Sequence, residues 1–176
     1  REVESVVFRK GEEGVFNGDQ RIFVAPPPHM VPSLMKDLFA WMKKSKDKVH
    51  PLILSAIFHY EFVFIHPFSD GNGRFAILGH TVVLSEWNKV FEYIPLESQI
   101  EKFQEGYYQA ISNCHVKGES TDFIEFMLKQ IDSILEEVIV QIRRSDDTIS
   151  EYVKKLFDVM DFEVPYTAVR LMELLG

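Results

Sequence analysis

The sequence predicts an all-α protein with one short β-hairpin near its N-terminus. Over most of the 176-residue chain, apolar side chains recur at helical spacings of three and four. Two short runs close to the beginning, rich in β-branched and aromatic residues and separated by a polar, glycine-rich stretch, predict the strands of the hairpin. Because 46% of the residues are hydrophobic, the chain can bury one substantial core.

The hairpin is expected from residues 3–8 and 21–24, which are short runs of β-branched and aromatic residues. The polar, glycine-rich stretch between them contains the pair Asn17 and Gly18. This arrangement suggests two strands joined by a long loop. Three prolines at residues 26–28 end the hairpin.

Helices are expected over most of the remaining chain. The first begins near Pro32, and its apolar residues recur at spacings of three and four. Residues 51–65 are too uniformly apolar for a surface helix and predict a central, buried one. Residues 72–86 predict the next helix, entered directly from a glycine-containing loop.

Capping boxes mark two later helices. Ser98 with Glu101 predicts a helix to about residue 112, and Asp122 with Glu125 predicts a long helix to about residue 144. After a charged break, residues 149–160 and 166–175 form two shorter helical patterns. Since the chain begins at Arg1 rather than methionine and ends abruptly at Gly176, we expect it to be part of a longer protein.

The charge of the chain narrows its partners. A formal net charge of -8 argues against a general nucleic-acid-binding or acidic-membrane surface. The one basic cluster, Lys43, Lys44, Lys46 and Lys48, follows an apolar run. We interpret it as the C-terminus of a helix, where cations favour the helix dipole, with a docking patch as the alternative.

No apolar run approaches the ~18 residues of a membrane span, and nothing resembles a signal peptide, so no membrane partner is expected. The single cysteine, Cys114, excludes an internal disulfide and fits a reducing, cytoplasmic compartment. We expect it to be a small buried hydrophobic residue rather than a nucleophile.

The stretch with the most chemistry is residues 66–74, His-Pro-Phe-Ser-Asp-Gly-Asn-Gly-Arg. His66 can take a proton, and Asp70 can hold a divalent cation. The two glycines let backbone N–H groups turn toward an anion, and Arg74 adds positive charge. The stretch therefore predicts a phosphate-binding site with its own general base.

Each half of this stretch has an ordinary explanation when taken alone. Asp-Gly-Asn-Gly is a common turn, and a histidine beside proline is often only a helix-end residue. Found together, between an apolar helix and another helix, they favour a functional site. No spacing among the other histidines suggests a zinc site, and we expect all of them to be structural: His29, His50, His59, His80 and His115.

The stretch is similar to the signature of Fic-domain proteins, His-x-Phe-x-Asp/Glu-Gly-Asn-Gly-Arg-x-x-Arg, and matches it through Arg74. Ile77 stands where the signature has its second arginine. The resemblance extends over about residues 1–140. Residues 23–28 and 31–35 resemble the family's passage from flap hairpin to helix. Residues 59–62 resemble the segment before the motif. In the later helices, the resemblance includes Tyr107, Tyr108 and residues 121–124.

The resemblance implies a Fic-type helical bundle in residues 1–144, with the flap at about residues 1–25 and without the helices that precede it in the family. Residues 145–176 would be a helical extension. Within it, residues 164–172 resemble the front half of a winged-helix unit, whose recognition helix would lie beyond Gly176. DNA would then be a partner through that unit, and a homodimer is a further expectation.

The resemblance also implies an activity, which is a protein adenylyltransferase that moves AMP from ATP to a Ser, Thr or Tyr hydroxyl of a target protein. His66 would be the base, and Asp70 would hold Mg²⁺. Phosphate would be bound by Gly71, Asn72, Gly73 and Arg74, with the Asn72 side chain as an additional donor. We expect Phe68 to pack in the core and fix the shape of the loop.

The flap of the family lends an edge to which a target segment adds as a strand. Val3, Val7 and Phe8 are therefore candidates for target contact. The alternative, to which we give equal weight, is that they cover the core.

Ile77 cannot replace the arginine of the signature, which in relatives contacts the terminal phosphate. Losing one charge-assisted contact costs roughly 1.5–3 kcal/mol, which would weaken ATP binding without removing base, metal ligand or anion site. Three interpretations stay open. The chain is an active adenylyltransferase, an enzyme that uses another nucleotide or a phosphocholine-type donor, or a non-catalytic binding module linked to a winged-helix unit.

The same arginine is, in relatives, the partner of an inhibitory glutamate in a Ser/Thr-x-x-x-Glu-Gly/Asn helix. The chain has only two near matches, Thr121 with Glu125 and Ser133 with Glu137, and both lack the final Gly or Asn. Since both lie in an amphipathic pattern where surface glutamates are ordinary, we interpret them as solvated residues.

Overall fold

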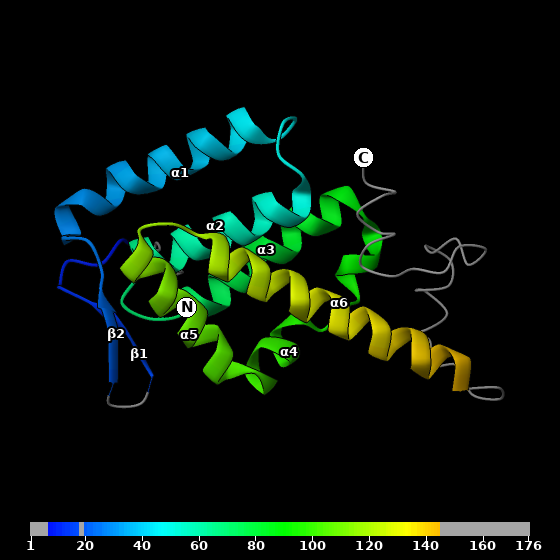
Figure 1. Ribbon diagram of the computed structural model, residues 1–176. Coiled ribbons are helices and arrows are strands. Elements are labelled where there is room, and N and C mark those ends of the chain that lie inside the picture. The colour runs from blue at the N-terminus through cyan, green and yellow to red at the C-terminus, as the bar shows by residue number, and fades with distance from the viewer. Residues whose placement is uncertain (1–6, 18–19, 145–176) are drawn as a thin grey trace, which may run out of the picture.

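The computed structural model describes residues 7–17 and 20–144 and confirms the all-α fold with one hairpin (Figure 1). The hairpin consists of β1 (Gly14–Asn17) and β2 (Gln20–Val24). The α-helices are α1 (Val31–Ser45), α2 (Pro51–Ile65), α3 (Asn72–Trp87), α4 (Leu96–Lys102), α5 (Gln104–Lys117) and α6 (Thr121–Arg144). Two 3₁₀ helices, η1 (Pro28–Met30) and η2 (Lys89–Glu92), precede α1 and follow α3.

Helix α2 is the centre of the molecule. It packs against α1, α3 and α6, and ten of its fifteen residues are buried, as its uniformly apolar sequence predicts. Its start is well defined, because the His50 Nδ1 accepts a hydrogen bond from the backbone N–H of Leu52 at 3.2 Å. Pro51 occupies the first helical position, where its missing N–H costs no hydrogen bond.

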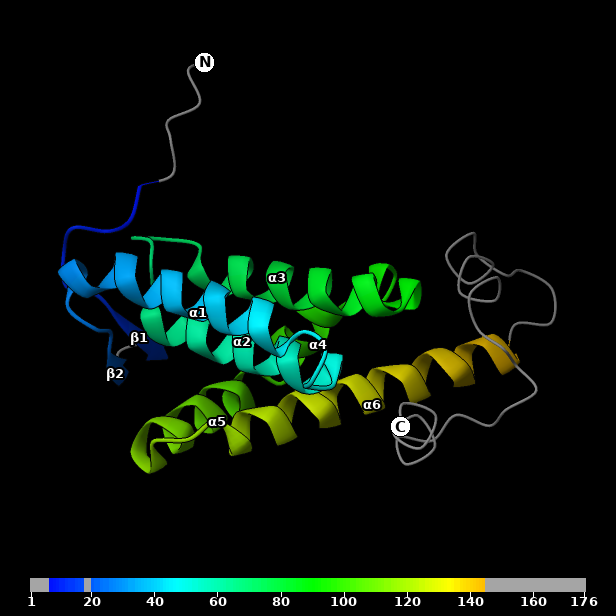
Figure 2. The same cartoon turned by 90° about the horizontal axis from the view of Figure 1, so that it is seen from above.

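Helices α2 and α3 form an antiparallel hairpin whose turn lies at the flap end of the molecule (Figure 2). They approach closely at Gly79, where an added Cβ would lie 2.1 Å from the Phe58 ring. Ala76 and Leu84 of α3 are fully buried in the same core. This packing fixes the two helix ends that carry the 66–74 stretch.

The expectation for the hairpin was wrong in its first strand. Residues 7 and 8 are irregular, and the strand that pairs with β2 is β1, antiparallel, with a register shift between Val15 and Phe16. β1 ends at Asn17, the first residue of the Asn-Gly pair, and β2 begins at Gln20. Asn-Gly is a strong signal for a tight hairpin turn, so this pair should have outweighed the apolar character of residues 3–8.

The helix expected from Ser98 is two helices in the structure. Helix α4 begins at Leu96, directly after Pro95, so Ser98 is inside the helix rather than at its N-cap. The helix extends back because Leu96 is buried one turn before Ile100. A break at Phe103, whose backbone N–H is shared between the Gln99 and Ile100 carbonyls, then separates α4 from α5.

The expectations for Cys114 and for the basic cluster are confirmed. Cys114 is fully buried, and its sulfur accepts a hydrogen bond from the backbone N–H of Phe123. Lys43 and Lys44 lie in the last turn of α1. Helix α6 ends at Arg144 as expected, but it begins at Thr121, so Asp122 lies in its first turn rather than at its N-cap. Of the helices that the structure describes, none combines the length and apolar character needed to cross a membrane.

The C-terminal expectations lie outside the described residues. These are the two helical patterns at residues 149–160 and 166–175, and with them the winged-helix extension and its DNA partner. They stay predictions.

Candidate active site at the turn between α2 and α3

The 66–74 stretch forms the turn between α2 and α3, and left-handed backbone occurs at both sides of it. His66 follows the last residue of α2 with φ 51° and ψ 59°. Gly71 precedes the first residue of α3 with φ 80°. A glycine adopts this conformation freely, whereas histidine does so at an energetic cost. His66 is the one non-glycine residue in the described ranges with a positive φ.

The His66 side chain is oriented so that one ring nitrogen can accept a proton. Its Nδ1 lies 3.3 Å from the Val63 carbonyl oxygen, one turn back in α2. A carbonyl can only accept a hydrogen bond, so Nδ1 carries the proton and Nε2 keeps its lone pair. Partial burial lowers the pKa of His66, and the positive charge of Arg9 lowers it further, against the opposing effects of the Val63 bond and Glu13. The ring is therefore neutral at physiological pH.

Asn72 holds the turn in shape. Its Oδ1 accepts a hydrogen bond from the Phe68 N–H at 2.9 Å, and its Nδ2 donates one to the Phe68 carbonyl at 2.7 Å. The side chain is 3% exposed. The Asn72 oxygen and one of its two N–H groups thus bind the backbone of the turn, which gives the side chain a structural role. Its expected role as a donor to phosphate stays a prediction.

Phe68 packs as expected. It is half-buried against the core, and its ring lies 5.2 Å from Phe75, 6.0 Å from Phe8 and 6.1 Å from Phe62, measured between centroids. The rings come from α3, the N-terminal segment and α2. This aromatic cluster fixes the loop between the base and the acidic residue.

Backbone N–H groups at the start of α3 are available to an anion. The first N–H groups of a helix have no partner within it, and here they belong to Asn72, Gly73 and Arg74. A Cβ on Gly73 would meet nothing within 4 Å, so this part of the turn is open to a ligand. The Gly71 N–H is different, because it donates to Asp70 Oδ1 at 2.6 Å.

Asp70 and Arg74 form an exposed ion pair, with 3.3 Å between Asp70 Oδ2 and the Arg74 guanidinium. The Asp70 side chain is 91% exposed. A single accessible carboxylate fits Mg²⁺, which takes one or two protein carboxylates and completes its shell with water and phosphate oxygens. Within the described residues, no group of three or more His, Cys, Asp or Glu side chains could hold a metal ion alone.

A cleft of about 300 Å³ runs from this turn between α3 and helices α4 and α5. Gly73, Arg74 and Ile77 form one wall. The other wall contains Glu97, Ile100, Glu101, Gln104, Tyr107 and Tyr108. Ile77 is half-buried and packs against the core, so an apolar surface faces the cleft where the Fic signature has its second arginine.

Comparisons with known proteins agree with this geometry. Residues 2–84 match the family model described as Fic/DOC family. A crystal structure of a Fic family protein from Desulfovibrio desulfuricans is similar to this chain, with a TM-score of 0.70 and 36% sequence identity over 88% of this chain and 51% of that one. The matched segment is a Fic domain.

Curated relatives of this Fic domain are named protein adenylyltransferases. The protein from Caenorhabditis elegans is 27% identical over 128 residues, which cover 72% of this chain and 24% of the relative. The protein from Nematostella vectensis is 31% identical over 60% of this chain and 24% of the relative. The chain thus spans about a quarter of the length of these two relatives.

Arg9 is the residue of the Fic domain that sequence reasoning missed. It is only 6% exposed, and its guanidinium donates to the backbone carbonyls of His66, Gly11, Pro26 and Ile65. The available signal was a cation directly after three apolar residues, Val-Val-Phe. A charged residue beside a predicted strand is so common on surfaces that this signal is weak.

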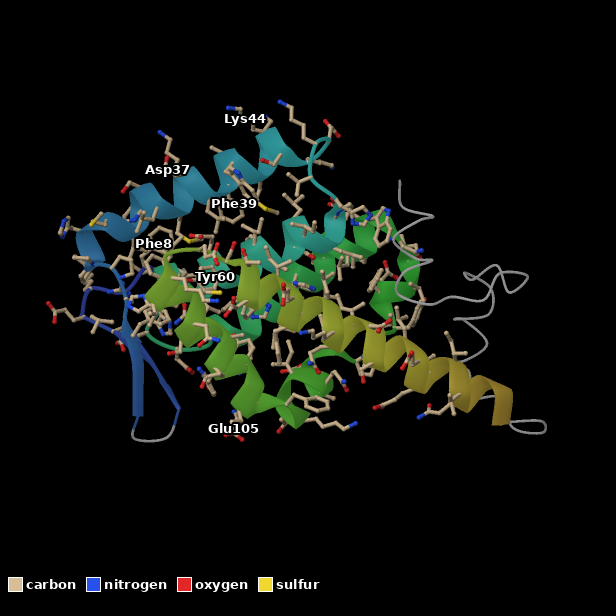
Figure 3. The ribbon with its side chains drawn as sticks, viewed as in Figure 1. Phe8, Asp37, Phe39, Lys44, Tyr60 and Glu105 are labelled. Carbon is tan, nitrogen blue, oxygen red and sulfur yellow. The ribbon has the colours of Figure 1, made fainter. Side chains whose placement is uncertain are left out.

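Of the three residues expected to contact a target, the structure describes Val7 and Phe8. Val3 lies outside the described residues. Val7 is 63% exposed and stays a candidate. Phe8 is half-buried on Phe68 at the hairpin end of the molecule (Figure 3), so it covers the core, which was the alternative expectation.

Proposed function

We propose that this Fic domain is a protein nucleotidyltransferase that transfers AMP from ATP to a Ser, Thr or Tyr hydroxyl of a target protein. The observation that carries the proposal is the His66 ring, a neutral imidazole with its Nε2 lone pair free, four residues before Asp70 and beside the N–H groups that begin α3. The names of the curated relatives support AMP transfer at the level of the family.

In the proposed reaction, His66 Nε2 takes the proton of the target hydroxyl while the hydroxyl oxygen attacks the α-phosphorus. An O–P bond to the target forms, the bond between the α-phosphorus and its bridging oxygen breaks, and pyrophosphate leaves with the electron pair. A side-chain hydroxyl has a high pKa and is a poor nucleophile, so this base is needed.

The backbone N–H groups of Asn72 and Gly73 and the Arg74 guanidinium would bind the phosphates. The pairing of Arg74 with Asp70 implies that the donor must separate the two side chains, at little cost because both are exposed. Mg²⁺ held by Asp70 and phosphate oxygens would neutralise charge on the leaving group.

The target would add to the hairpin as a further strand. The described sheet has only two strands, so each strand leaves one row of backbone N–H and C=O groups unpaired. Near the end of β2, the Phe23 side chain stacks on His115 of α5 and on Phe64 of α2. These contacts fix the hairpin to α2 two residues before His66, the proposed general base.

The test is incubation with α-labelled ATP and Mg²⁺, with and without a cell lysate. We expect label on protein with the unaltered chain and with Ser69→Ala, an exposed residue of the same turn. His66→Ala should lose at least about 100-fold in rate. Equal labelling by His66→Ala would refute the role of this residue.

A second donor is favoured by one observation, the chemistry of the cleft. Ile77 supplies no charge there, and Glu97 and Glu101 on the opposite wall are unfavourable to an additional phosphate. A donor with fewer negative charges beyond its β-phosphate would need no cation at position 77 and would not be repelled by Glu97 and Glu101. Such a donor could be another nucleotide or a phosphocholine-type compound.

Competition separates the two donors. If ATP is the donor, Ile77→Arg should increase labelling from limiting ATP about tenfold or more, by the size of one charge-assisted contact. If another donor is used, an excess of unlabelled CDP-choline should block transfer from ATP in the unaltered chain, and the ATP rate should be low.

A further inference from the structure

We infer that Arg9 is a positioning residue that holds the His66 backbone in its left-handed conformation and fixes the flap hairpin to the same point. The inference rests on the proposed function only for its kinetic test. It concerns a residue outside the 66–74 stretch, on a segment that precedes the hairpin.

The contacts of Arg9 converge on the end of α2. Its Nε donates to the His66 carbonyl at 2.6 Å, and a terminal nitrogen lies 3.3 Å from the Ile65 carbonyl. Its own backbone N–H donates to the Pro67 carbonyl at 2.9 Å. Three consecutive carbonyls, at the end of the helix where carbonyls lack intrahelical partners, are therefore bound by one residue.

These bonds act where the backbone is least favourable. His66 has a positive φ, a conformation that persists in a residue with a side chain only when the surroundings enforce it. A glycine at this position would adopt the conformation without cost, but the residue is a histidine. The guanidinium binds the carbonyl that this conformation turns away from the helix, and its positive charge is favourable at the C-terminus of α2.

The same guanidinium binds the flap. It donates to the Gly11 carbonyl at 2.8 Å and to the Pro26 carbonyl, which lies two residues after β2. A backbone bond from Ala25 to the Glu13 carbonyl closes the base of the hairpin beside it. One buried cation thus joins the segment before the flap, the segment after the flap and the residue that carries the base.

A planar guanidinium with several fixed donors is needed for this geometry. Lysine has one ammonium group and cannot bind carbonyls of three segments in the same directions. The buried position also excludes water as a substitute partner, because Arg9 is only 6% exposed. Arg9→Lys should therefore keep the charge and lose the positioning.

The test compares Arg9→Lys and Arg9→Gln with Lys10→Gln, the exposed neighbouring cation, in the 176-residue chain. In label transfer, we expect kcat to fall 10- to 100-fold in both Arg9 variants, since small displacements of a base have effects of this size. KM for the nucleotide should change less than threefold, because the anion site lies on α3. Lys10→Gln should match the unaltered chain.

A second readout does not need activity. NMR of the His66 ring should show a raised pKa in Arg9→Gln, because the positive charge of Arg9 is removed while Val63 and Glu13 stay in place. The His66 Cα shift should move away from its left-handed value in both variants. The His66 chemical shifts test the inference even if the unaltered chain transfers label from no donor. That absence of transfer would count against the proposed function alone.

Two results would overturn the inference. One is unchanged kcat and unchanged His66 shifts in a folded Arg9→Gln protein. The other is an equal fall in kcat and rise in KM with a lower melting temperature, which would indicate a general structural role. If Arg9→Gln does not fold, the decision passes to Arg9→Lys, which keeps the buried charge.

Discussion

The groups around His66 set its tautomer and its protonation state. The Val63 carbonyl fixes the tautomer, and partial burial and the Arg9 charge favour the neutral ring. The sequence predicted the residue and its neighbours in the turn, since the residue types are contiguous. It could not predict that Asn72 binds the Phe68 backbone, because that bond depends on the exact backbone path of the turn. Nor could it predict that Arg9 binds the His66 carbonyl, because these residues are far apart in the chain.

The rate of transfer should therefore depend on pH through His66. In the folded protein the pKa of His66 lies below 6.5, so the neutral ring should already predominate at pH 6.5. The value of kcat/KM should therefore fall only in more acidic buffer. The measurement is the rate of label transfer from pH 4.5 to 8. An acid limb centred above pH 6.5 would contradict this assignment, provided that the protein is folded throughout.

At the scale of elements, the pairing of α2 with α3 places the base and the anion site at one turn. The boundaries of α2 were predicted from its apolar sequence and Pro51, and those of α3 from the glycines of the turn, because these signals are local. The break at Phe103 and the position of β1 were not predicted. The break separates two helices that each pack against α6, and no local pattern reports this packing. The position of β1 did have a local signal, the pair Asn17 and Gly18, which the apolar character of residues 3–8 obscured.

Gly79→Ala tests this pairing. The added Cβ would lie 2.1 Å from a Phe58 ring atom, and this ring is held by contacts with Phe39 and Phe62, so one helix must move. We expect a loss of about 1–3 kcal/mol in the free energy of unfolding, the usual cost of overpacking. The measurement is chemical denaturation.

The control for that substitution is Gly73→Ala, where nothing lies within 4 Å of the added atom. Alanine is the better helix former, so stability should be unchanged or higher by up to about 1 kcal/mol. If both substitutions had the same effect, close approach of α2 and α3 at Gly79 would be disproved.

For the whole molecule, a buried histidine cluster joins four helices. His59 of α2 and His80 of α3 are fully buried with 5.8 Å between ring centroids, and the His59 ring also contacts Tyr107 of α5 and Phe123 of α6. The His59 Nε2 and the Tyr107 hydroxyl are 3.1 Å apart. The sequence indicated only that these histidines are structural, because their burial follows from the complete fold.

This cluster should make the protein sensitive to acid. Burial lowers the pKa of His80 from 6.5 to about 4 and that of His59 well below 6.5, where the proximity of His80 contributes. Between pH 6.5 and about pH 4, the histidines of the unfolded chain bind more protons than those of the folded chain. The free energy of unfolding therefore decreases as the pH falls through this range. For His80 alone the loss by pH 4 is roughly 3 kcal/mol, at about 1.4 kcal/mol per pKa unit.

Denaturation at pH 7.5, 6 and 5 measures this effect. His29→Gln, an exposed histidine, should keep the full pH dependence, whereas His80→Gln should reduce it. A free energy of unfolding that is constant from pH 7.5 to 5 would be incompatible with two neutral buried histidines.

The central claim is that the turn between α2 and α3 transfers a nucleotidyl group, and the position of a radioactive label tests it most directly. The purified chain is incubated with Mg²⁺ and a cell lysate, with ATP labelled at the α-phosphate in one reaction and at the γ-phosphate in the other. We predict His66-dependent labelling of protein from the α-position and none from the γ-position. Label from the γ-position, or α-label that is unchanged in His66→Ala, would contradict the account.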